Sequence, residues 1–78
     1  MNEGLLKNLN ERLDFFMKEK LKVHIDLTDG TFLNGFVIKN SKENVWVMLE
    51  DKLGEVLVFV KDIKKLQQFR KERIERGF

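Results

Sequence analysis

The chain has 78 residues, enough for one domain, and a domain of this size buries only about 60 to 65% of its unfolded surface. It contains no cysteine, which excludes a disulfide framework and a cysteine-ligated zinc site. No segment approaches the roughly 20 apolar residues of a membrane span, and the amino terminus lacks a basic stretch followed by a hydrophobic run. We therefore expect a soluble, cytoplasmic protein with no metal or cofactor.

The formal net charge of +2 is unevenly distributed. Residues 1–60 contain 8 basic and 10 acidic residues, a balance of −2, whereas residues 61–78 contain 7 and 3, a balance of +4. The basic character thus belongs to the carboxyl end. Such a segment either contacts the phosphates of a nucleic acid or is an ordinary charged surface helix with Glu–Arg pairs.

Apolar residues recur at helical spacing from residue 5 to about residue 20. The polar residues between them fall mostly on the opposite side, a pattern typical of an amphipathic helix. The predicted apolar stripe consists of Leu5, Leu6, Leu9, Leu13, Phe16 and Met17.

The next segment predicts a β-hairpin. Residues 23–28 alternate between apolar and polar side chains, which gives a strand with one buried face. Asp29-Gly30 favours a two-residue type I′ turn, in which both central residues have positive φ. Gly35 then falls inside the second strand, where a missing side chain is favourable only if the sheet bends sharply or another backbone comes close.

The remaining elements follow from turn and strand signals. Residues 39–44 read as a polar loop, residues 45–49 as a third strand and residues 56–60 as a fourth. Residues 63–66 fit either a short fifth strand or the start of a helix running towards the chain end. The expected layout is a helix within residues 1–21, a barrel within 22–66 and a basic tail over 67–78.

The central strands are apolar on both faces. One face fills a small barrel, and the second must be covered by helices, another subunit or a ligand. The run V-L-V-F-V at 56–60 would be hazardous as a free edge, so pairing between subunits would resolve both problems. For Trp46 we favour packing beneath the first helix over stacking on a base, and for Phe32 and Phe36 core or interface packing.

The pattern L-T-D-G-T-F-L-N-G-F-V at 27–37 resembles the first motif of the Sm-like family, which includes the LSm and Hfq-like proteins. The run V-L-V-F-V-K-D-I-K-K-L at 56–66 resembles the second motif. The resemblance covers roughly residues 5–66. It implies a mainly β fold: a small, strongly bent, five-stranded antiparallel barrel of Sm-like (SH3-like) type, preceded by a helix. The sequence at the carboxyl end also allows a second helix there.

The resemblance also implies function. Sm-like proteins form hexameric or heptameric rings in which the fourth strand of one subunit pairs with the fifth of the next, and they bind single-stranded RNA around the pore and sometimes across a ring face. The Hfq-like pattern Tyr-Lys-His corresponds here to Phe59-Val60-Lys61. Lys61 is the residue that this resemblance assigns to RNA. Together with the polar loop and the basic segment, the predicted RNA-binding residues are Lys61, Asn40, Lys42, Asn44, Lys64, Lys65, Arg70 and Arg73.

No constellation of catalytic residues appears. His24 lies on a polar strand face with no second histidine or cysteine to complete a metal site, so we expect a surface histidine. Ser41 lacks a nucleophile motif, and Glu50-Asp51 lies at a turn among lysines. The sequence therefore predicts a non-catalytic RNA-binding homo-oligomeric ring in RNA metabolism or regulation. The alternatives are a protein-interaction module that docks a partner through its apolar sheet face, and a dimer stabilised through its helices.

Overall fold

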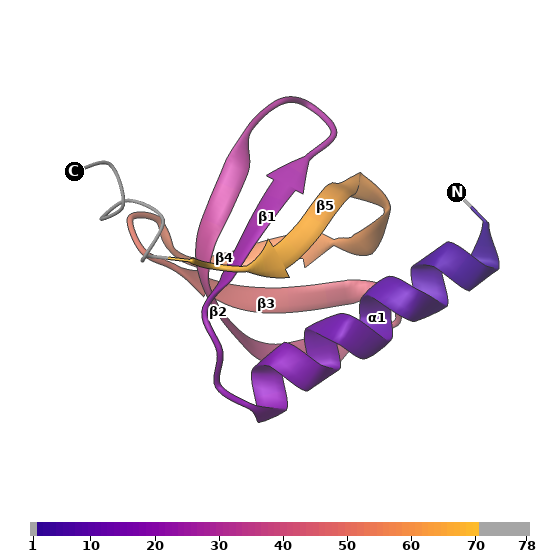
Figure 1. The fold of residues 1–78 in the computed structure, drawn as a ribbon, viewed down its shortest axis with the longest axis horizontal. Helices are drawn as coiled ribbons and strands as arrows, with labels where there is room; N and C mark the ends of the chain where they lie inside the picture. The colour runs from indigo at the N-terminus through magenta and orange to yellow at the C-terminus, as the bar shows by residue number, and fades with distance from the viewer. Residues whose placement is uncertain (1, 71–78) are drawn as a thin grey trace.

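The computed structural model describes residues 2–70, which form one helix, five strands and a short 3-10 helix (Figure 1). The elements are α1 (Glu3–Lys18), β1 (Val23–Leu27), β2 (Phe32–Lys42), β3 (Val45–Glu50), β4 (Gly54–Phe59), η1 (Val60–Asp62) and β5 (Ile63–Gln68). The strands form one antiparallel sheet in the order β4-β3-β2-β1-β5. The predicted fold class, a mainly β Sm-like barrel with an amino-terminal helix, is confirmed. The expected carboxyl-terminal helix falls within residues 71–78, outside the described residues.

Helix α1 begins at a side-chain cap. The side chain of Asn2 accepts a hydrogen bond from the Leu5 N–H at 2.7 Å, which satisfies one of the unpaired donors of the first turn. Most of the predicted apolar stripe faces the sheet, where Leu9, Leu13 and Phe16 are buried. Leu5 lies at the margin of the stripe and is exposed.

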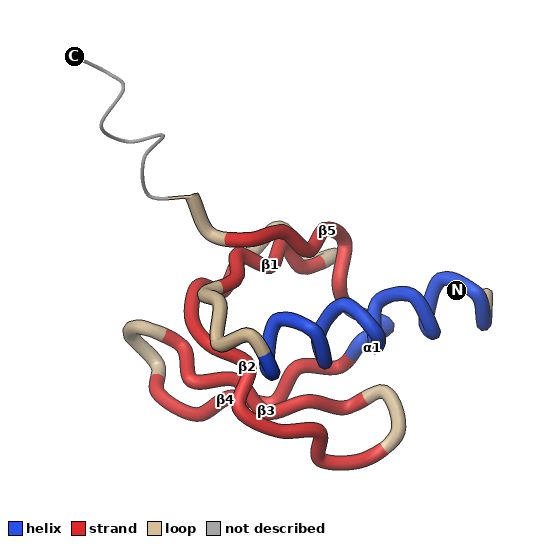
Figure 2. Tube along the Cα trace, turned by 60° about the horizontal axis from the view of Figure 1, so that its bottom comes forward, coloured by secondary structure: helices blue, strands red, loops and turns tan. Residues whose placement is uncertain are grey.

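The core lies between α1 and the inner face of the curved sheet. Figure 2 shows the β1–β5 pair and the β3–β4 hairpin on opposite sides, with α1 lying across the space between them. Trp46 is buried there, and its Nε1 donates to Oδ1 of Asn10 on α1 at 2.7 Å. The preferred interpretation of this tryptophan as a packing residue is confirmed. The buried core residues are Leu9, Leu13, Phe16, Val23, Ile25, Leu33, Val37, Trp46, Met48, Val58, Val60, Ile63 and Leu66.

The backbones of β2 and β3 approach each other closely at Gly35. A Cβ atom on Gly35 would lie 2.0 Å from the Leu49 carbonyl oxygen and 2.9 Å from the Glu50 Cα. Both distances are far inside van der Waals contact, and both obstacles are backbone atoms. The expected close approach of another backbone at this glycine is confirmed.

The first hairpin differs from its prediction. Among non-glycine residues 2–70 only Lys20 and Asn44 have positive φ, so Asp29 does not adopt the type I′ conformation. The Gly30 N–H donates to the Leu27 carbonyl at 3.1 Å, and the Leu27 N–H to the Thr31 carbonyl at 2.8 Å. These bonds, with Gly30 at φ 93°, define a three-residue loop with a glycine bulge. Thr31 also donates from its backbone N–H and its hydroxyl to the Asp29 carboxylate.

The polar segment at residues 39–44 was predicted as a loop, and this is wrong for most of its length. Strand β2 continues to Lys42 and pairs with β3 through two register shifts, which are bulges that admit polar residues. Only Glu43 and Asn44 form the turn, with Asn44 at φ 62°.

The sequence also left open whether the residues after 62 form a strand or a helix, and in the structure residues 63–68 are a strand. The buried Ile63 and Leu66 reach the core from that strand, whereas Phe32 and Phe36 are exposed, so the core interpretation of those two aromatics is wrong.

The Glu50 side chain links the β3–β4 turn to β2 through hydrogen bonds. Its side chain is buried, and its carboxylate accepts from the backbone N–H groups of Lys52 at 2.7 Å, Leu53 at 2.9 Å and Asn34 at 3.1 Å. The Lys52 bond, followed by those of Leu53 and Asn34, lowers the pKa of Glu50 below its ordinary value, and burial opposes this only in part. The carboxylate is therefore a structural group.

We expect Glu50→Gln to lower the free energy of unfolding at neutral pH, because a neutral amide is a weaker acceptor for three N–H groups. The unfolded chain binds this proton near the ordinary pKa of about 4.3 and the folded chain only at lower pH. The contribution is therefore complete above the unfolded pKa and is lost as the pH falls through the folded pKa. Urea midpoints of both proteins should differ at pH 7 and converge towards pH 3. A difference in midpoint that stays the same at every pH would contradict this role of Glu50. The pKa of Asp29 is also lowered, by its bonds to Thr31, but this group contributes equally to both proteins and cancels in the comparison.

Candidate functional site

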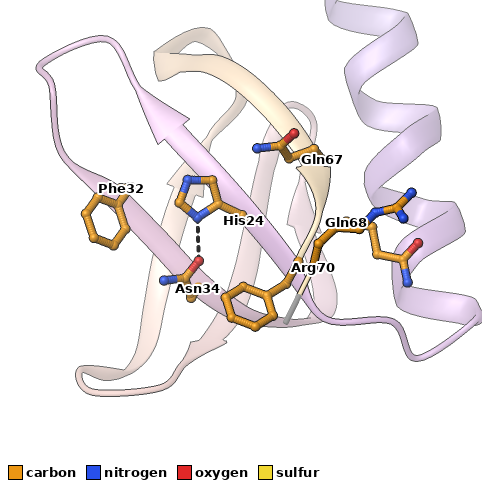
Figure 3. A pocket seen from close by; sticks show the side chains of 7 residues that line it. His24, Phe32, Asn34, Gln67, Gln68 and Arg70 are labelled. Atoms are coloured by element: carbon orange, nitrogen blue, oxygen red, sulfur yellow. Dashed lines mark hydrogen bonds between the residues drawn. The ribbon is translucent and has the colours of Figure 1, made fainter. Parts of the chain in front are cut away.

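A pocket of about 420 Å³ opens on the outer face of β1, opposite the core residues Val23 and Ile25 (Figure 3). It is formed where β1 lies between the start of β2 and the end of β5, because β1 pairs with both strands. Aromatic, amide and guanidinium groups meet there. The lining residues are His24, Phe32, Asn34, Gln67, Gln68, Phe69 and Arg70.

Contacts to β2 and within β1 hold the His24 ring in this pocket. Its Nδ1 lies 2.5 Å from Oδ1 of Asn34, and its Nε2 lies 3.1 Å from a carboxylate oxygen of Asp26. The His24 and Phe32 rings have centroids 5.3 Å apart and are tilted by 32°. His24 lies on the sheet surface as expected, but in a shared network. An ordered aromatic surface beside amide groups can stack on a flat ligand and hydrogen-bond to its edge.

The basic residues predicted to bind RNA follow the chain from η1 into β5. Lys61 is exposed in η1, and Lys64 and Lys65 are exposed on β5. Lys65 pairs with Asp26 across the strands, close to the contacts of His24, and Arg70 lines the pocket itself. The structure thus brings Lys65, Arg70 and the pocket to one side of the β1–β5 pair, while Arg73 lies outside the described residues.

The other predicted residues lie at the β2–β3 turn and serve its structure. Asn40 donates from Nδ2 to the carbonyls of Lys42 and Val45, both at 3.0 Å. Oδ1 of Asn44 accepts from Asn10 of α1 at 2.7 Å. The Asn44 carbonyl accepts from the N–H of Val60 at 2.9 Å, which brings this turn beside η1 and its Lys61.

Acidic residues outnumber basic ones in the space between this turn and α1. A second pocket, of about 600 Å³, lies between α1 and the turn. Glu3, Glu11 and Glu43 line it with a single lysine, Lys7. This excess of negative charge repels phosphate groups. Of the two ends of the barrel, the β1–β5 side is therefore the more favourable surface for a polyanion.

Strand β5 has an open edge. The bond from the Leu27 N–H to the Thr31 carbonyl sets the alternation along β1, so that Ile25 directs its backbone groups to β2. Leu66, the β5 partner of Ile25, therefore turns its N–H and C=O away from β1. Gln68 has the same orientation by alternation. Among residues 2–70 no strand covers this side of β5.

Strand β4 has the second open edge. The Asp51 N–H donates to the Asn34 carbonyl at 2.9 Å, which fixes the alternation between β2 and β3, so Leu49 directs its backbone groups to β2. Its β4 partner, Glu55, then turns its own groups away from β3. Leu57 and Phe59 share that orientation, and their side chains are 56% and 41% exposed. One barrel thus presents an apolar strand edge and, at the far end of the sheet, an edge with lysines.

Sequence reasoning missed several residues of the outer pocket. Asn34 and Gln67 were not singled out, and Phe32 was assigned to packing. The only local signal was the position of Asn34 two residues after Phe32, on the outer face of β2 that opposes Leu33 and Gly35. Their meeting with Gln67 depends on the β1–β5 register, which joins distant parts of the chain.

Other classes of site find no support in the part of the chain that the structure describes. Within residues 2–70 no three His, Asp or Glu side chains are grouped to hold a metal ion. The one long helix among these residues, α1, is too short and too polar to cross a membrane.

Comparison with known proteins identifies the fold. No protein-family model matches the sequence, and no curated protein matches it. Among solved structures, the chain is similar to a 1.55 Å crystal structure of the pleiotropic translational regulator Hfq, with a TM-score of 0.65 and 14% sequence identity. The match covers 76% of this chain and 95% of that one. With its helix, its strand order and the close backbone approach at Gly35, the chain has the Sm-like fold.

Proposed function

We propose that the protein is a non-catalytic, RNA-binding Sm-like protein of the cytoplasm that works as a homo-oligomeric ring. The observation that carries the proposal is the meeting of an exposed aromatic ring and two amide side chains with Arg70 and the neighbouring Lys65 on one side of the barrel. Stacking on Phe32 and hydrogen bonding to Asn34 and Gln67 are the interactions by which single-stranded RNA is bound. Basic side chains beside them supply phosphate contacts.

The two open strand edges support assembly. Each edge offers alternate backbone N–H and C=O groups to another strand, and antiparallel or parallel pairing would satisfy them. Pairing β4 of one protomer with β5 of the next is a head-to-tail contact, which closes into a ring when the rotation between protomers permits. It would also cover part of the exposed apolar surface of Leu57 and Phe59.

The native mass of the nuclease-treated protein tests the assembly. Light scattering during size-exclusion chromatography, with native mass spectrometry, should give six or seven protomers. Hydrogen exchange should then find the Leu66 and Gln68 amides protected, since these face the open edge of β5. A monomer at every concentration would refute the ring, and an oligomer in which these amides exchange freely would refute pairing at this edge.

For RNA binding we expect Lys61→Ala to weaken the affinity and the combined replacement of Lys61, Lys64 and Lys65 by alanine to weaken it further. Removing one phosphate contact changes the slope of log K against log salt by about 0.7 for single strands, so the triple variant should flatten the slope by up to about 2. Filter binding with uridine-rich and adenine-rich RNA at two salt concentrations measures both quantities. Lys52→Ala, on the β3–β4 turn, is the matched control. Wild-type affinity in Lys61→Ala would remove that lysine from the site.

One observation favours the second candidate, a protein-interaction module. Phe36, Leu49 and Leu57 are exposed on the face of the sheet turned away from the core, and Phe36 and Leu49 lie directly opposite each other on neighbouring strands. An apolar surface of this kind is typical of a contact between proteins. If the protein is a monomer and binds neither uridine-rich nor adenine-rich RNA, this candidate is favoured over the ring.

A further inference from the structure

Arg12 of α1 reaches across to the open edge of β5. Its guanidinium donates a hydrogen bond to the carbonyl oxygen of Leu66. The Leu66 side chain is buried in the core, whereas its backbone groups point away from β1, as the strand alternation requires. The helix therefore places a fixed positive charge on the strand edge that is open to pairing.

The Arg12 guanidinium and a neighbouring strand compete for the Leu66 carbonyl oxygen. A paired strand lies about 4.8 Å from β5 in the plane of the sheet, with its own N–H groups directed at the β5 carbonyls. The guanidinium bound to the Leu66 carbonyl oxygen already occupies an acceptor that such a strand would use. The bond is also charge-assisted, which makes it stronger than a bond between neutral groups. A strand that pairs here must first displace Arg12.

We infer that Arg12 guards the β5 edge, keeping the free protomer from pairing until another strand displaces the guanidinium. This inference rests on the proposed assembly through β4 and β5 and adds its regulation. Natural sheets cover or charge their free edges to prevent unwanted association. Here the device comes from the helix, so strand pairing and the position of one helical side chain are coupled.

The test compares wild type with Arg12→Ala, Arg12→Lys and Lys7→Ala. The quantity measured is the protomer concentration at half-assembly, by mass photometry and by light scattering during size-exclusion chromatography. Lys7→Ala removes the same charge from the same helix and controls for net charge. Thermal unfolding of each variant under monomeric conditions checks that the fold is intact, and hydrogen exchange at Leu66 and Gln68 checks that any assembly uses the β5 edge.

We expect Arg12→Ala to assemble at about a tenfold lower concentration than wild type, which corresponds to about 1.4 kcal/mol. Arg12→Lys should fall between the two, and Lys7→Ala should match wild type. If wild type forms a ring and Arg12→Ala assembles no more readily, the guard is refuted and the proposed ring stands. If neither protein assembles at any concentration, both the ring and the role of Arg12 are refuted, since the β5 edge would then fail to pair even without the guanidinium. Equal gains in Arg12→Ala and Lys7→Ala would assign the effect to net charge and would also refute the guard.

Discussion

Gly35→Ala is expected to destabilise the protein by about 3 kcal/mol or more, at or above the upper end of the usual cost of overpacking. The new methyl group would lie 2.0 Å from the Leu49 carbonyl oxygen, and relief would require the backbones of β2 and β3 to separate at this point. A domain of this size has a total stability on the order of 4 to 12 kcal/mol. The expected fall in Tm is about 12 to 24 °C.

Gly4→Ala is the matched control for this prediction. The same methyl group at Gly4 meets only Oδ1 of Asn2, at 3.5 Å, an ordinary contact. Because alanine is favoured over glycine in helices by up to about 1 kcal/mol, this variant should be as stable as wild type or slightly more stable. Thermal and urea unfolding of the three proteins measure the difference. Similar stabilities for the two variants would contradict the close approach at Gly35.

Leu57→Lys is expected to break the proposed ring. Leu57 lies on the open edge of β4, and a lysine there would face the lysines of an incoming β5. Like charges at an interface cost several kcal/mol, so the protomer concentration at half-assembly should rise about a hundredfold or more. Native mass over a dilution series measures this shift.

Leu53→Lys separates the edge from general surface charge. Leu53 is 68% exposed in the β3–β4 turn, against 56% for Leu57, so both substitutions add one charge at an exposed leucine. We expect Leu53→Lys to assemble like wild type and both variants to keep their thermal stability. Equal behaviour of the two variants, whether assembled or dissociated, would argue against pairing through β4.

Local patterns predicted most of the fold. The stripe that includes Leu9, Leu13 and Phe16 specified α1, and alternation around Ile25 specified β1, because burial on one face imposes the period of each element. Gly35 could be interpreted from sequence alone, since a glycine inside an apolar strand usually marks a bulge, a tight bend or a close backbone approach. The polar end of β2 could not, because its pairing with β3 satisfies the backbone without an apolar pattern in the sequence.

The candidate site was predictable only in its charges. Lys61, Lys64 and Lys65 stand in one basic segment that is visible in the sequence. Phe32 and Gln67 meet because β1 lies between distant strands, and no local period encodes that arrangement. The turn at Asp29 was misassigned for a related reason: Asp-Gly fits several loop types, and the geometry is decided by which residues of the flanking strands pair.

The β1–β5 pair has a consequence for the order of folding. Strands β1 to β4 follow one another as hairpins, whereas β5 must return to β1 from the far end of the described chain. Closing that long loop costs more chain entropy than forming a hairpin. In refolding followed by pulsed hydrogen exchange, amides between β1 and β5 should gain protection after those between β2 and β3, and simultaneous protection would refute this order. Until β5 docks, β1 keeps an unpaired edge, so a chain that has folded only as far as β4 presents a different second edge from that of the complete sheet.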